Sequence, residues 1–509
     1  MNIRKAACLA GLIATAAHAQ GVPPVATAQG KIQGKSEGDT TAFLGIPYAA
    51  PPVGALRWQP PQPVTPWQGV RPATQPGAAC MQTPPEKGPE AALRHQPMSE
   101  DCLTLNVWQP RHPTANPLPV MVWIHGGAFR IGAASLPLYN GAALAAQGAV
   151  IVSLNYRLGI FGTFAHPALG KDGGNNYGLL DQIAALKWVK QNIAAFGGDP
   201  NNVTVWGESA GGASVAYLMT SPLAAGLFNK AIMQSGAIDL PEASRPQAEA
   251  IFTQALAKAA APTAQVLRVQ PAPTAQALRA LPAAQLLALP LPRSATMPFI
   301  DGRTLTQHTR DAFAEGHYHR VPLLIGSNDD EAGFFPPQWS ASVPARLGEA
   351  AWQQARQLTD GYGSGQDALR AAQIATDKFA TVNTRALANA SAQHGQPTWR
   401  YYFRYLPASQ RTTQPGAIHT AEIPYVFGTL NTEGTPDAAS QALSRELMAR
   451  WLAFARTGAP NPAGLGAWPP YQPPGQGIWQ IGKAGSGAIA EPAPARLDFL
   501  EAQKQFRMN

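Results

Sequence analysis

The stretch Asn202–Gly212 reads NVTVWGESAGG. Val203–Trp206 favours a β-strand, and Ala210–Met219, just after it, is predicted to be helical. Between them stands Ser209 in the pattern G-x-S-x-G, with small residues on both sides. A sharp turn from strand to helix requires small neighbours when it presents a hydroxyl at a helix N-terminus. The stretch predicts a nucleophilic serine; a glycine-rich turn with a solvated serine is the alternative.

Other apolar runs alternate with helical patterns along the chain. Tyr177–Phe196 has apolar residues at helical spacing and is stopped by Gly197 and Gly198. The predicted strands are Val120–Ile124, Ala149–Leu154, Ala231–Gln234, Val321–Ile325 and Tyr401–Tyr405. Strands without polar alternation, separated by helices, are typical of a mostly parallel sheet covered on both faces. The sequence therefore predicts an α/β fold.

Composition predicts a large folded chain rather than a disordered or nucleic-acid-binding one. The 509 residues are 45% hydrophobic and 13% charged, with a formal charge of +8. The basic residues are scattered, which favours solubility over a nucleic-acid surface. Residues 241–292 and 340–392 are rich in Ala, Gln, Leu and Pro but keep apolar periodicity. We expect one domain, residues 20–509, with helical insertions near these two segments forming a cap or wall.

The first 19 residues resemble an export signal. Arg4 and Lys5 precede a short apolar stretch, and Ala-His-Ala follows, which predicts cleavage after Ala19. An exported chain retaining only Cys80 and Cys102 is expected to oxidise them to a disulfide. Closing this loop contributes roughly 3 kcal/mol through loop entropy. We predict a periplasmic or secreted bacterial protein.

A serine nucleophile requires a base and an acid. Five histidines follow Ser209: His308, His317, His319, His394 and His419. Position after the late strand at 401–405 favours His419 over the others. The acid is expected just past a strand, and Asp329, Asp330 and Glu331 all follow the strand at 321–325. Residue chemistry alone does not choose among these three carboxylates.

A second motif predicts where an oxyanion would bind. His125-Gly126-Gly127-Ala128 follows the strand at 120–124 and resembles the glycine-rich loop of esterases. The N–H groups of Gly127 and Ala128, with that of Ala210, would supply three donors to a tetrahedral intermediate. The alternative is an ordinary glycine turn.

Taken together, these residues resemble the type-B carboxylesterase and cholinesterase family of α/β-hydrolases. The resemblance covers nearly all of the mature chain and follows the order of the family's motifs. The matching segments are FLGIPYAAPPVGALRW (Phe43–Trp58), SEDCLTLNVW (Ser99–Trp108), VWIHGGAF, VSLNYRLG, the long block from NYGLLDQ to WGESAGG, AIMQSG, WLAFARTGAPNP and WPPY. Several long motifs in one order make the resemblance specific.

The resemblance implies an α/β-hydrolase fold and assigns the choices left open above. It implies that Glu331 in GSNDDEAGFF is the acid and that His419 in HTAEIPYVFG is the base. It also matches Cys80–Cys102 to the family disulfide. Glu208 and Ser235 would lie next to the catalytic groups, or would serve only as structural hydrogen-bond partners.

The implied function is hydrolysis of small carboxylic esters through a Ser-His-Glu triad, without a metal or organic cofactor. Amide, carbamate or other acyl hydrolysis by the same triad is an alternative, and a non-catalytic binding protein on this fold is a more remote one. The loop Met81–Asp101 has no Phe, Tyr or Trp to hold a quaternary ammonium, which disfavours choline esters. We expect no membrane anchor, and the sequence leaves the oligomeric state open.

Overall fold

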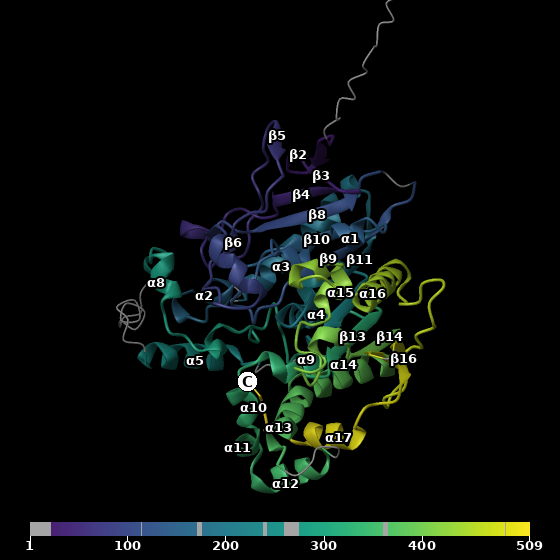
Figure 1. Cartoon of the computed structure of the whole chain (residues 1–509). Coiled ribbons are helices and arrows are strands. Elements are labelled where there is room, and N and C mark those ends of the chain that lie inside the picture. The colour runs from purple at the N-terminus through teal and green to yellow at the C-terminus, as the bar shows by residue number, and fades with distance from the viewer. Residues whose placement is uncertain are drawn as a thin grey trace, which may run out of the picture.

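The computed structural model describes residues 22–112, 115–169, 176–237, 242–258, 274–359, 365–483 and 485–508. The predicted export signal, residues 1–19, lies outside the described residues. A twisted sheet runs through the middle of the molecule, with helices on both sides (Figure 1). Within the described ranges, no helix combines the length and the apolar character needed to cross a membrane.

The central sheet has eleven strands in the described part of the chain. Across the sheet they follow the order β16 (Gly485–Ile489), β15 (Ile478–Gly482), β14 (Thr398–Phe403), β13 (Leu323–Asn328), β12 (Lys230–Gln234), β11 (Gly198–Glu208), β9 (Leu118–Ile124), β10 (Val150–Leu154), β8 (Thr104–Pro110), β4 (Thr40–Pro47) and β3 (Lys35–Glu37). Strands from β10 to β15 are parallel, and antiparallel pairs form both edges. The predicted mostly parallel sheet is confirmed, whereas the antiparallel edges were not predicted.

The side chains of β9 show why these strands appear in the sequence as continuous apolar runs. Val122 and Ile124 pack into one core cluster, and Met121 and Trp123 pack into another on the opposite face. All four are fully buried. The first face is covered by α3 (Tyr177–Asn192), α4 (Ala210–Thr220) and α14 (Val382–Gln393), and the second by α1 (Ala142–Ala145) and α16 (Ala438–Thr457). Burial on both faces requires apolar residues at every position.

The predicted strands are observed, but each begins one to five residues away from its predicted start. The run predicted from Val321 starts as β13 at Leu323, because Pro322 has no N–H to give to a ladder. The run predicted at Tyr401–Tyr405 is observed as β14, Thr398–Phe403. The predicted helix Tyr177–Phe196 is confirmed as α3 followed by a 3-10 turn, η5 (Ile193–Phe196).

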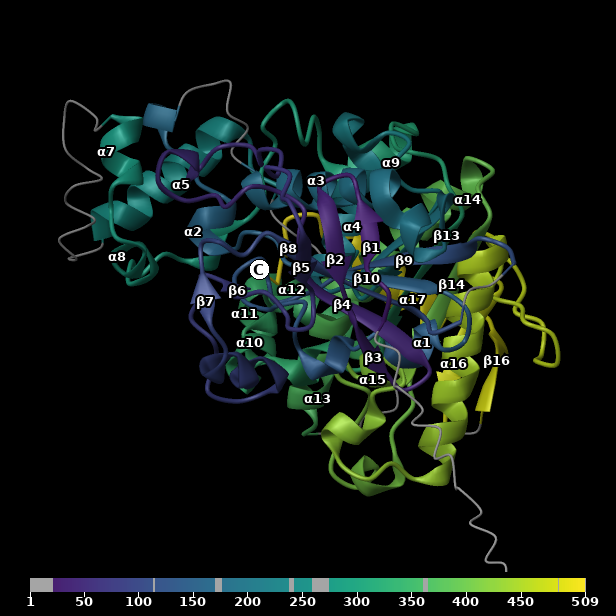
Figure 2. The same cartoon turned by 90° about the horizontal axis from the view of Figure 1, so that it is seen from above.

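Further helices project from the sheet. They are α2 (Gly159–Gly162), α5 (Arg245–Lys258), α7 (Ala275–Arg279), α8 (Ala283–Leu287), α9 (Thr309–Glu315), α10 (Pro337–Ala341), α11 (Val343–Leu347), α12 (Glu349–Gln357), α13 (Asp367–Thr376), the π-helix η9 (Asp377–Thr381), α15 (Ile423–Phe427) and α17 (Pro494–Ala502). Figure 2 shows α5, α7 and α8 at one side of the molecule, away from α16. The assignment of these segments as insertions into a single domain stays a prediction.

Two small sheets complete the described fold. The first joins β1 (Val25–Thr27), β2 (Gly30–Gln33) and β5 (Val70–Pro72). The second pairs β6 (Ala79–Cys80) with β7 (Met98–Ser99). Cys80 and Cys102 form a disulfide, so the predicted pairing is confirmed.

Candidate active site

Ser209 occupies a tight turn between β11 and α4. Its backbone adopts φ 56° and ψ −123°, a strained conformation that costs about 1–3 kcal/mol in a non-glycine residue. The Ser209 N–H donates to the carbonyl oxygen of Gln234 over 2.9 Å. A Cβ on Gly211 would lie 2.0 Å from the carbonyl oxygen of Ile124. Only glycine fits there, and this close packing explains the small residues around the serine.

Glu331 and His419 come together from distant parts of the chain. Glu331 follows β13 and begins the 3-10 helix η8 (Glu331–Phe334), and His419 precedes α15. The imidazole Nδ1 lies 2.5 Å from Oε2 of Glu331, and the Asn328 N–H donates to Oε1 over 2.8 Å. Both side chains are buried. A buried carboxylate on Nδ1 fixes the tautomer that leaves Nε2 able to accept a proton.

The neighbouring carboxylates point elsewhere. Asp329 Oδ2 pairs with Arg404 Nε at 3.0 Å, and its other oxygen accepts the Ala417 N–H at 2.7 Å. Burial and the adjacent Asp329 raise the pKa of Asp330 to about 6. Of the three carboxylates that the sequence left open, Glu331 is the one hydrogen-bonded to an imidazole.

The other candidate histidines lie in different surroundings. His308 pairs with Glu242, His317 with Glu315, His319 with the carbonyl oxygen of Ser221, and the His394 ring packs near the Tyr318 ring. None of these contacts involves Ser209 or Glu331 in the described part of the chain.

The free nitrogen of His419 faces the serine turn. Nε2 lies 3.2 Å from Oε1 of Glu208, the residue that immediately precedes Ser209. No hydrogen bond joins Ser209 Oγ to His419 among the described residues. Hydrogen bonds between nucleophile and base are often long until substrate binds. The structure thus brings Glu331, His419 and Glu208 into contact, with Ser209 next to Glu208 in the chain.

The electrostatic environment makes His419 more basic than a free histidine. Burial lowers the pKa of His419, but the Glu208 and Glu331 carboxylates together outweigh burial and raise the pKa to about 9. Burial in turn raises the pKa of Glu208, against the opposite effect of the imidazole. The imidazole therefore lies between two acidic groups, one at each ring nitrogen.

Three aromatic rings surround the imidazole. The ring centroids of Phe334, Phe335 and Phe379 lie 5.4, 6.0 and 5.6 Å from that of His419. Phe334 and Phe335 belong to the GSNDDEAGFF motif, but sequence reasoning gave them no role. Phe379 comes from η9, inside one of the predicted insertions, and no local signal marked it. These rings limit water access to the imidazole.

A buried polar network fixes the elements that carry these residues. Asn328 Nδ2 donates to Glu422 Oε2 over 2.8 Å, and Gln234 Nε2 donates to Oε1 of the same carboxylate over 3.0 Å. Trp451 Nε1 donates to Gln234 Oε1 over 3.0 Å. Glu422 thereby joins the ends of β12 and β13 to the histidine loop. Sequence reasoning missed this role, although Glu422 stands in the motif quoted for His419.

The predicted oxyanion loop lies against the serine. A Cβ on Gly126 would lie 3.1 Å from the Cβ of Ser209. Gly127 and Ala128 have φ angles of 99° and 58°, which turn the backbone sharply. Within the described residues, no hydrogen bond uses the N–H groups of Gly127, Ala128 and Ala210. These three groups are free to bind an anion, and their role as oxyanion donors stays a prediction.

Buried polar side chains form hydrogen bonds to the backbone of that loop and of the residues that follow it. The Tyr156 hydroxyl donates to the carbonyl oxygen of His125 over 2.9 Å, and burial lowers the pKa of His125 to about 4, so its imidazole is neutral. Gln82 exchanges two 2.8 Å hydrogen bonds with the backbone of Gly132. Gln82 lies in the disulfide loop, close to Cys80, so the disulfide anchors a segment that is hydrogen-bonded just beyond the predicted oxyanion loop.

Two further polar groups lie nearby. The Ser235 hydroxyl is fully buried and has no hydrogen-bond partner among the described residues. Burial raises the pKa of Glu90, which comes from the disulfide loop and interacts electrostatically with His419. Sequence reasoning predicted Ser235 to lie near the site and missed Glu90. The described residues contain no group of three or more His, Cys, Asp or Glu that could hold a metal ion.

Comparisons with known proteins agree on one family. The model of the carboxylesterase family matches residues 21–364 and 348–500. The fumonisin B1 esterase of Sphingopyxis macrogoltabida is 38% identical over 490 residues, 92% of this chain and 88% of that protein. The para-nitrobenzyl esterase of Bacillus subtilis (strain 168) is 39% identical over 475 residues, 88% and 92% of the two chains. A solved structure of PNB esterase, 37% identical, superposes with a TM-score of 0.76 over 94% of this chain and 100% of that one.

Proposed function

The chain belongs to the carboxylesterase family, whose named members are carboxylic ester hydrolases, and from that premise we propose that Ser209, His419 and Glu331 form its catalytic triad. The proposal rests above all on one observation, the 2.5 Å contact between the buried Glu331 carboxylate and His419 Nδ1. A strained serine turn beside that imidazole adds to it. The substrates are small carboxylic esters.

The reaction proceeds in two acyl-transfer steps. His419 Nε2 accepts the proton of Ser209 Oγ as that oxygen attacks the ester carbonyl carbon. Glu331 orients the imidazole and stabilises its charged form. The protonated imidazole then gives its proton to the departing alcohol, and the acyl group stays on Ser209. Water deprotonated by His419 attacks the acyl-enzyme and releases the acid.

Backbone donors stabilise the negative charge that develops on the carbonyl oxygen. The N–H groups of Gly127, Ala128 and Ala210 fill this role. Among the described residues, none of the three donates a hydrogen bond to another group, and this supports the assignment. Each such donor is typically worth about 2.7–4 kcal/mol in the transition state. Glu208 and Ser235 act as hydrogen-bonding or electrostatic neighbours of the triad.

The chain organisation fits an exported enzyme. Residues 1–19 serve as a signal peptide and residues 20–509 form one hydrolase domain with helical insertions near 241–292 and 340–392. The Cys80–Cys102 disulfide supports export, because such bonds persist in oxidising compartments.

Hydrolysis of p-nitrophenyl butyrate by the purified chain tests this function. We expect turnover by the parent and its loss in Ser209→Ala, by roughly 10⁴-fold or more. Ser214→Ala, a buried serine on the same helix, controls for general damage to α4. Equal activity of parent and Ser209→Ala would refute the triad. A matched p-nitroanilide, assayed alongside, tests whether amides are preferred.

A further inference from the structure

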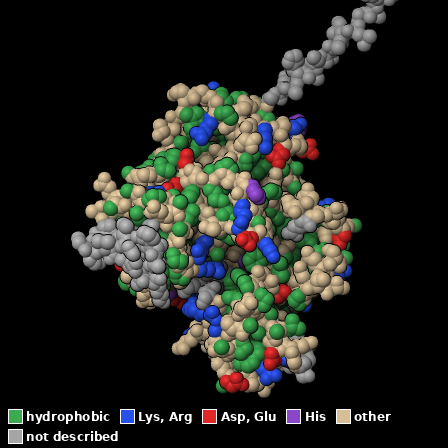
Figure 3. Space-filling view, turned by 60° about the vertical axis from the view of Figure 1, so that its left-hand side comes forward, with side chains coloured by type: hydrophobic (Ala, Val, Ile, Leu, Met, Phe, Trp, Pro, Cys, Tyr) green, Lys and Arg blue, Asp and Glu red, His purple; other side chains and the backbone are tan. Residues whose placement is uncertain are grey.

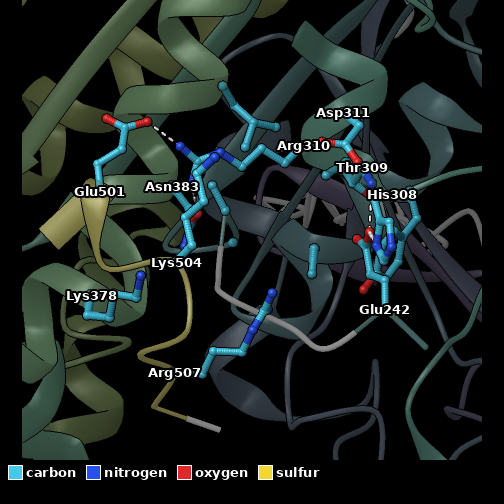
Figure 4. Close-up of a pocket in the computed structure, with 16 residues that line it drawn as sticks. Glu242, His308, Thr309, Arg310, Asp311, Lys378, Asn383, Glu501, Lys504 and Arg507 are labelled. Carbon is cyan, nitrogen blue, oxygen red and sulfur yellow. Dashed lines mark hydrogen bonds and ion pairs between the residues drawn. The ribbon is translucent and has the colours of Figure 1, made fainter. Parts of the chain in front are cut away.

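A cavity of about 510 Å³ lies beside the proposed triad. It is lined by residues of α4, α9, η9, α14 and α17, and also by Gly236, Ala237, Glu242, His308, Lys504 and Arg507. Lys and Arg side chains gather around a hollow in the face drawn in Figure 3. Figure 4 shows the cavity with its charged side chains pointing inward from several elements. We call it the basic pocket.

The basic pocket shares two walls with the triad. Ala213 lines the pocket and lies one helical turn after Ser209, to whose carbonyl oxygen its N–H donates over 2.8 Å. This places the two residues about 6 Å apart along α4. On the second wall, Lys378 lines the pocket, while the next residue, Phe379, packs on the imidazole of His419. The basic pocket and the triad therefore adjoin through α4 and η9.

Positive charge predominates in the lining. The cations are Arg310, Lys378, Lys504 and Arg507, and the carboxylates are Glu242, Asp311 and Glu501. Figure 4 shows Lys378, Lys504 and Arg507 on one side and the Glu242–His308 pair on the other. Four Lys or Arg side chains against three carboxylates leave one positive charge, before any protonation of His308.

Two of the carboxylates already have partners. Glu501 forms an ion pair with Arg310. Glu242 accepts the Thr309 N–H over 2.6 Å and lies 3.5 Å from His308 Nδ1. These two acids are paired with groups of the pocket wall. The side of the pocket that carries Lys504 and Arg507 is therefore basic.

The chain end supplies the cation that is available to a ligand. Within the described residues the ammonium of Lys504 makes no hydrogen bond or ion pair, and its side chain is exposed. The adjoining Lys378 is 5% exposed, and its ammonium donates to the carbonyl oxygens of Leu500 and Gln503 over 3.3 and 3.1 Å. These bonds hold the segment carrying Lys504 against η9 and fix the position of the basic side.

We propose that the basic pocket binds a free carboxylate of the ester substrate while the scissile carbonyl lies at Ser209. The substrates are then monoesters of dicarboxylic or polycarboxylic acids, or esters whose alcohol carries a carboxylate. This inference rests on the proposed esterase function and names the substrate class of that site. A carboxylate gains charge-assisted hydrogen bonds from Lys and Arg that a neutral chain of equal size does not.

Two matched pairs of esters test the proposal on the purified full chain. The first pair is mono-p-nitrophenyl adipate and its methyl ester, which differ by the acyl-side carboxylate. The second is 4-carboxyphenyl hexanoate and its methyl ester, which differ by a carboxylate on the leaving group. The readout is the preference, the ratio of kcat/KM for the acid to that for its methyl ester. We expect a preference of about tenfold in one pair, falling as salt is added.

Variants connect that preference to the pocket. Lys504→Gln should lower the preference about threefold, and Lys504→Glu should lower it further. The double variant Lys504→Gln, Arg507→Gln should abolish most of it. The control is Lys31→Gln, since Lys31 is an exposed lysine on β2, outside the pocket lining. This control should keep the parent preference.

Each outcome decides the proposal. A preference in either pair that the pocket variants reduce and Lys31→Gln retains supports it. Turnover of both methyl esters without any preference, or with one that the variants leave unchanged, overturns the carboxylate site and leaves the esterase function standing. If no ester is hydrolysed faster than by Ser209→Ala, the proposed function fails, and this inference fails with it.

Discussion

The ends of the central strands and the helices that project from the sheet differ in the side chains that they hold. The strand ends and the loop before α15 hold Ser209, Glu331 and His419 in buried positions, and the backbone of Ser209 is strained. The projecting helices and the chain end hold exposed charges around a wide cavity. Strained backbone needs rigid surroundings, and the parallel strands supply them. Exposed charged walls tolerate change, so we expect the first region to decide whether the reaction occurs and the second to decide on which ester.

The sharpest test of this comparison is at Glu331. Glu331→Gln keeps the shape of the side chain but removes the charge that fixes the imidazole tautomer. We expect kcat to fall by roughly 10³–10⁴-fold, as when the acid of a triad is replaced by its amide. The measurement is the kcat of p-nitrophenyl butyrate hydrolysis. Asp329→Asn is the matched control, because Asp329 faces Arg404 rather than His419. A larger loss in Asp329→Asn than in Glu331→Gln would contradict the assignment of the acid.

The strand ends were also the more predictable region. The apolar runs and the G-x-S-x-G turn predicted the parallel sheet and the position of Ser209, because burial on both faces and tight packing leave a local signature. Glu331 could not be chosen over Asp329 or Asp330 from residue chemistry, since three adjacent carboxylates have the same local pattern. The family resemblance selected Glu331, and the contact with His419 supports that selection.

The projecting region left no comparable signature. Phe379 reaches His419 because a π-helix interrupts the run from α13 to α14, and such a bulge cannot be read from amino-acid spacing. Lys504 and Arg507 meet Lys378 through long-range packing of the chain end on η9. Their juxtaposition depends on tertiary contacts, so the basic pocket was invisible in the sequence.

The next test asks whether the packing of the projecting helices can be destabilised without loss of catalytic activity. Trp352 on α12 is 5% exposed and packs in a separate core cluster with residues of α13 and α17. Trp352→Ala should lower the free energy of unfolding by about 3–4 kcal/mol through lost burial and a new cavity. Urea unfolding measures this loss. At low temperature, kcat for p-nitrophenyl butyrate should stay within about threefold of the parent value. A loss of kcat as large as that in Glu331→Gln would end the distinction between the two regions.

The disulfide loop is expected to affect both stability and activity, because it is closed by Cys80–Cys102 and is bonded through Gln82 to Gly132, just beyond the predicted oxyanion loop. Replacing both Cys80 and Cys102 by Ser should cost roughly 3 kcal/mol of unfolding free energy by freeing the loop in the unfolded chain. The shift of the urea midpoint measures it. Gln82→Ala, with the disulfide intact, should lower kcat while leaving most of the stability. Equal stability of the parent and the double Ser variant would contradict the role of the bond.

The smallest expected effect separates the two acids on His419. Hydrolysis needs neutral His419, so kcat/KM should fall as the pH drops through the raised pKa of this residue, about 9. Glu208→Gln removes a negative charge that favours the imidazolium, so the pKa decreases and the acidic limb of the profile moves to lower pH. We expect a shift of about one pH unit, equivalent to about 1.4 kcal/mol. The measurement is kcat/KM for p-nitrophenyl butyrate across the pH range in which the chain stays folded.

Glu242→Gln is the control for that shift, because Glu242 pairs with His308 in the basic pocket. Its acidic limb should coincide with that of the parent. If Glu208→Gln also leaves the limb in place, Glu208 carries a proton in the working enzyme and adds no negative charge beside Nε2. The presence or absence of this one shift therefore tells whether His419 lies between two negative charges or between one charge and a neutral hydrogen-bonding group.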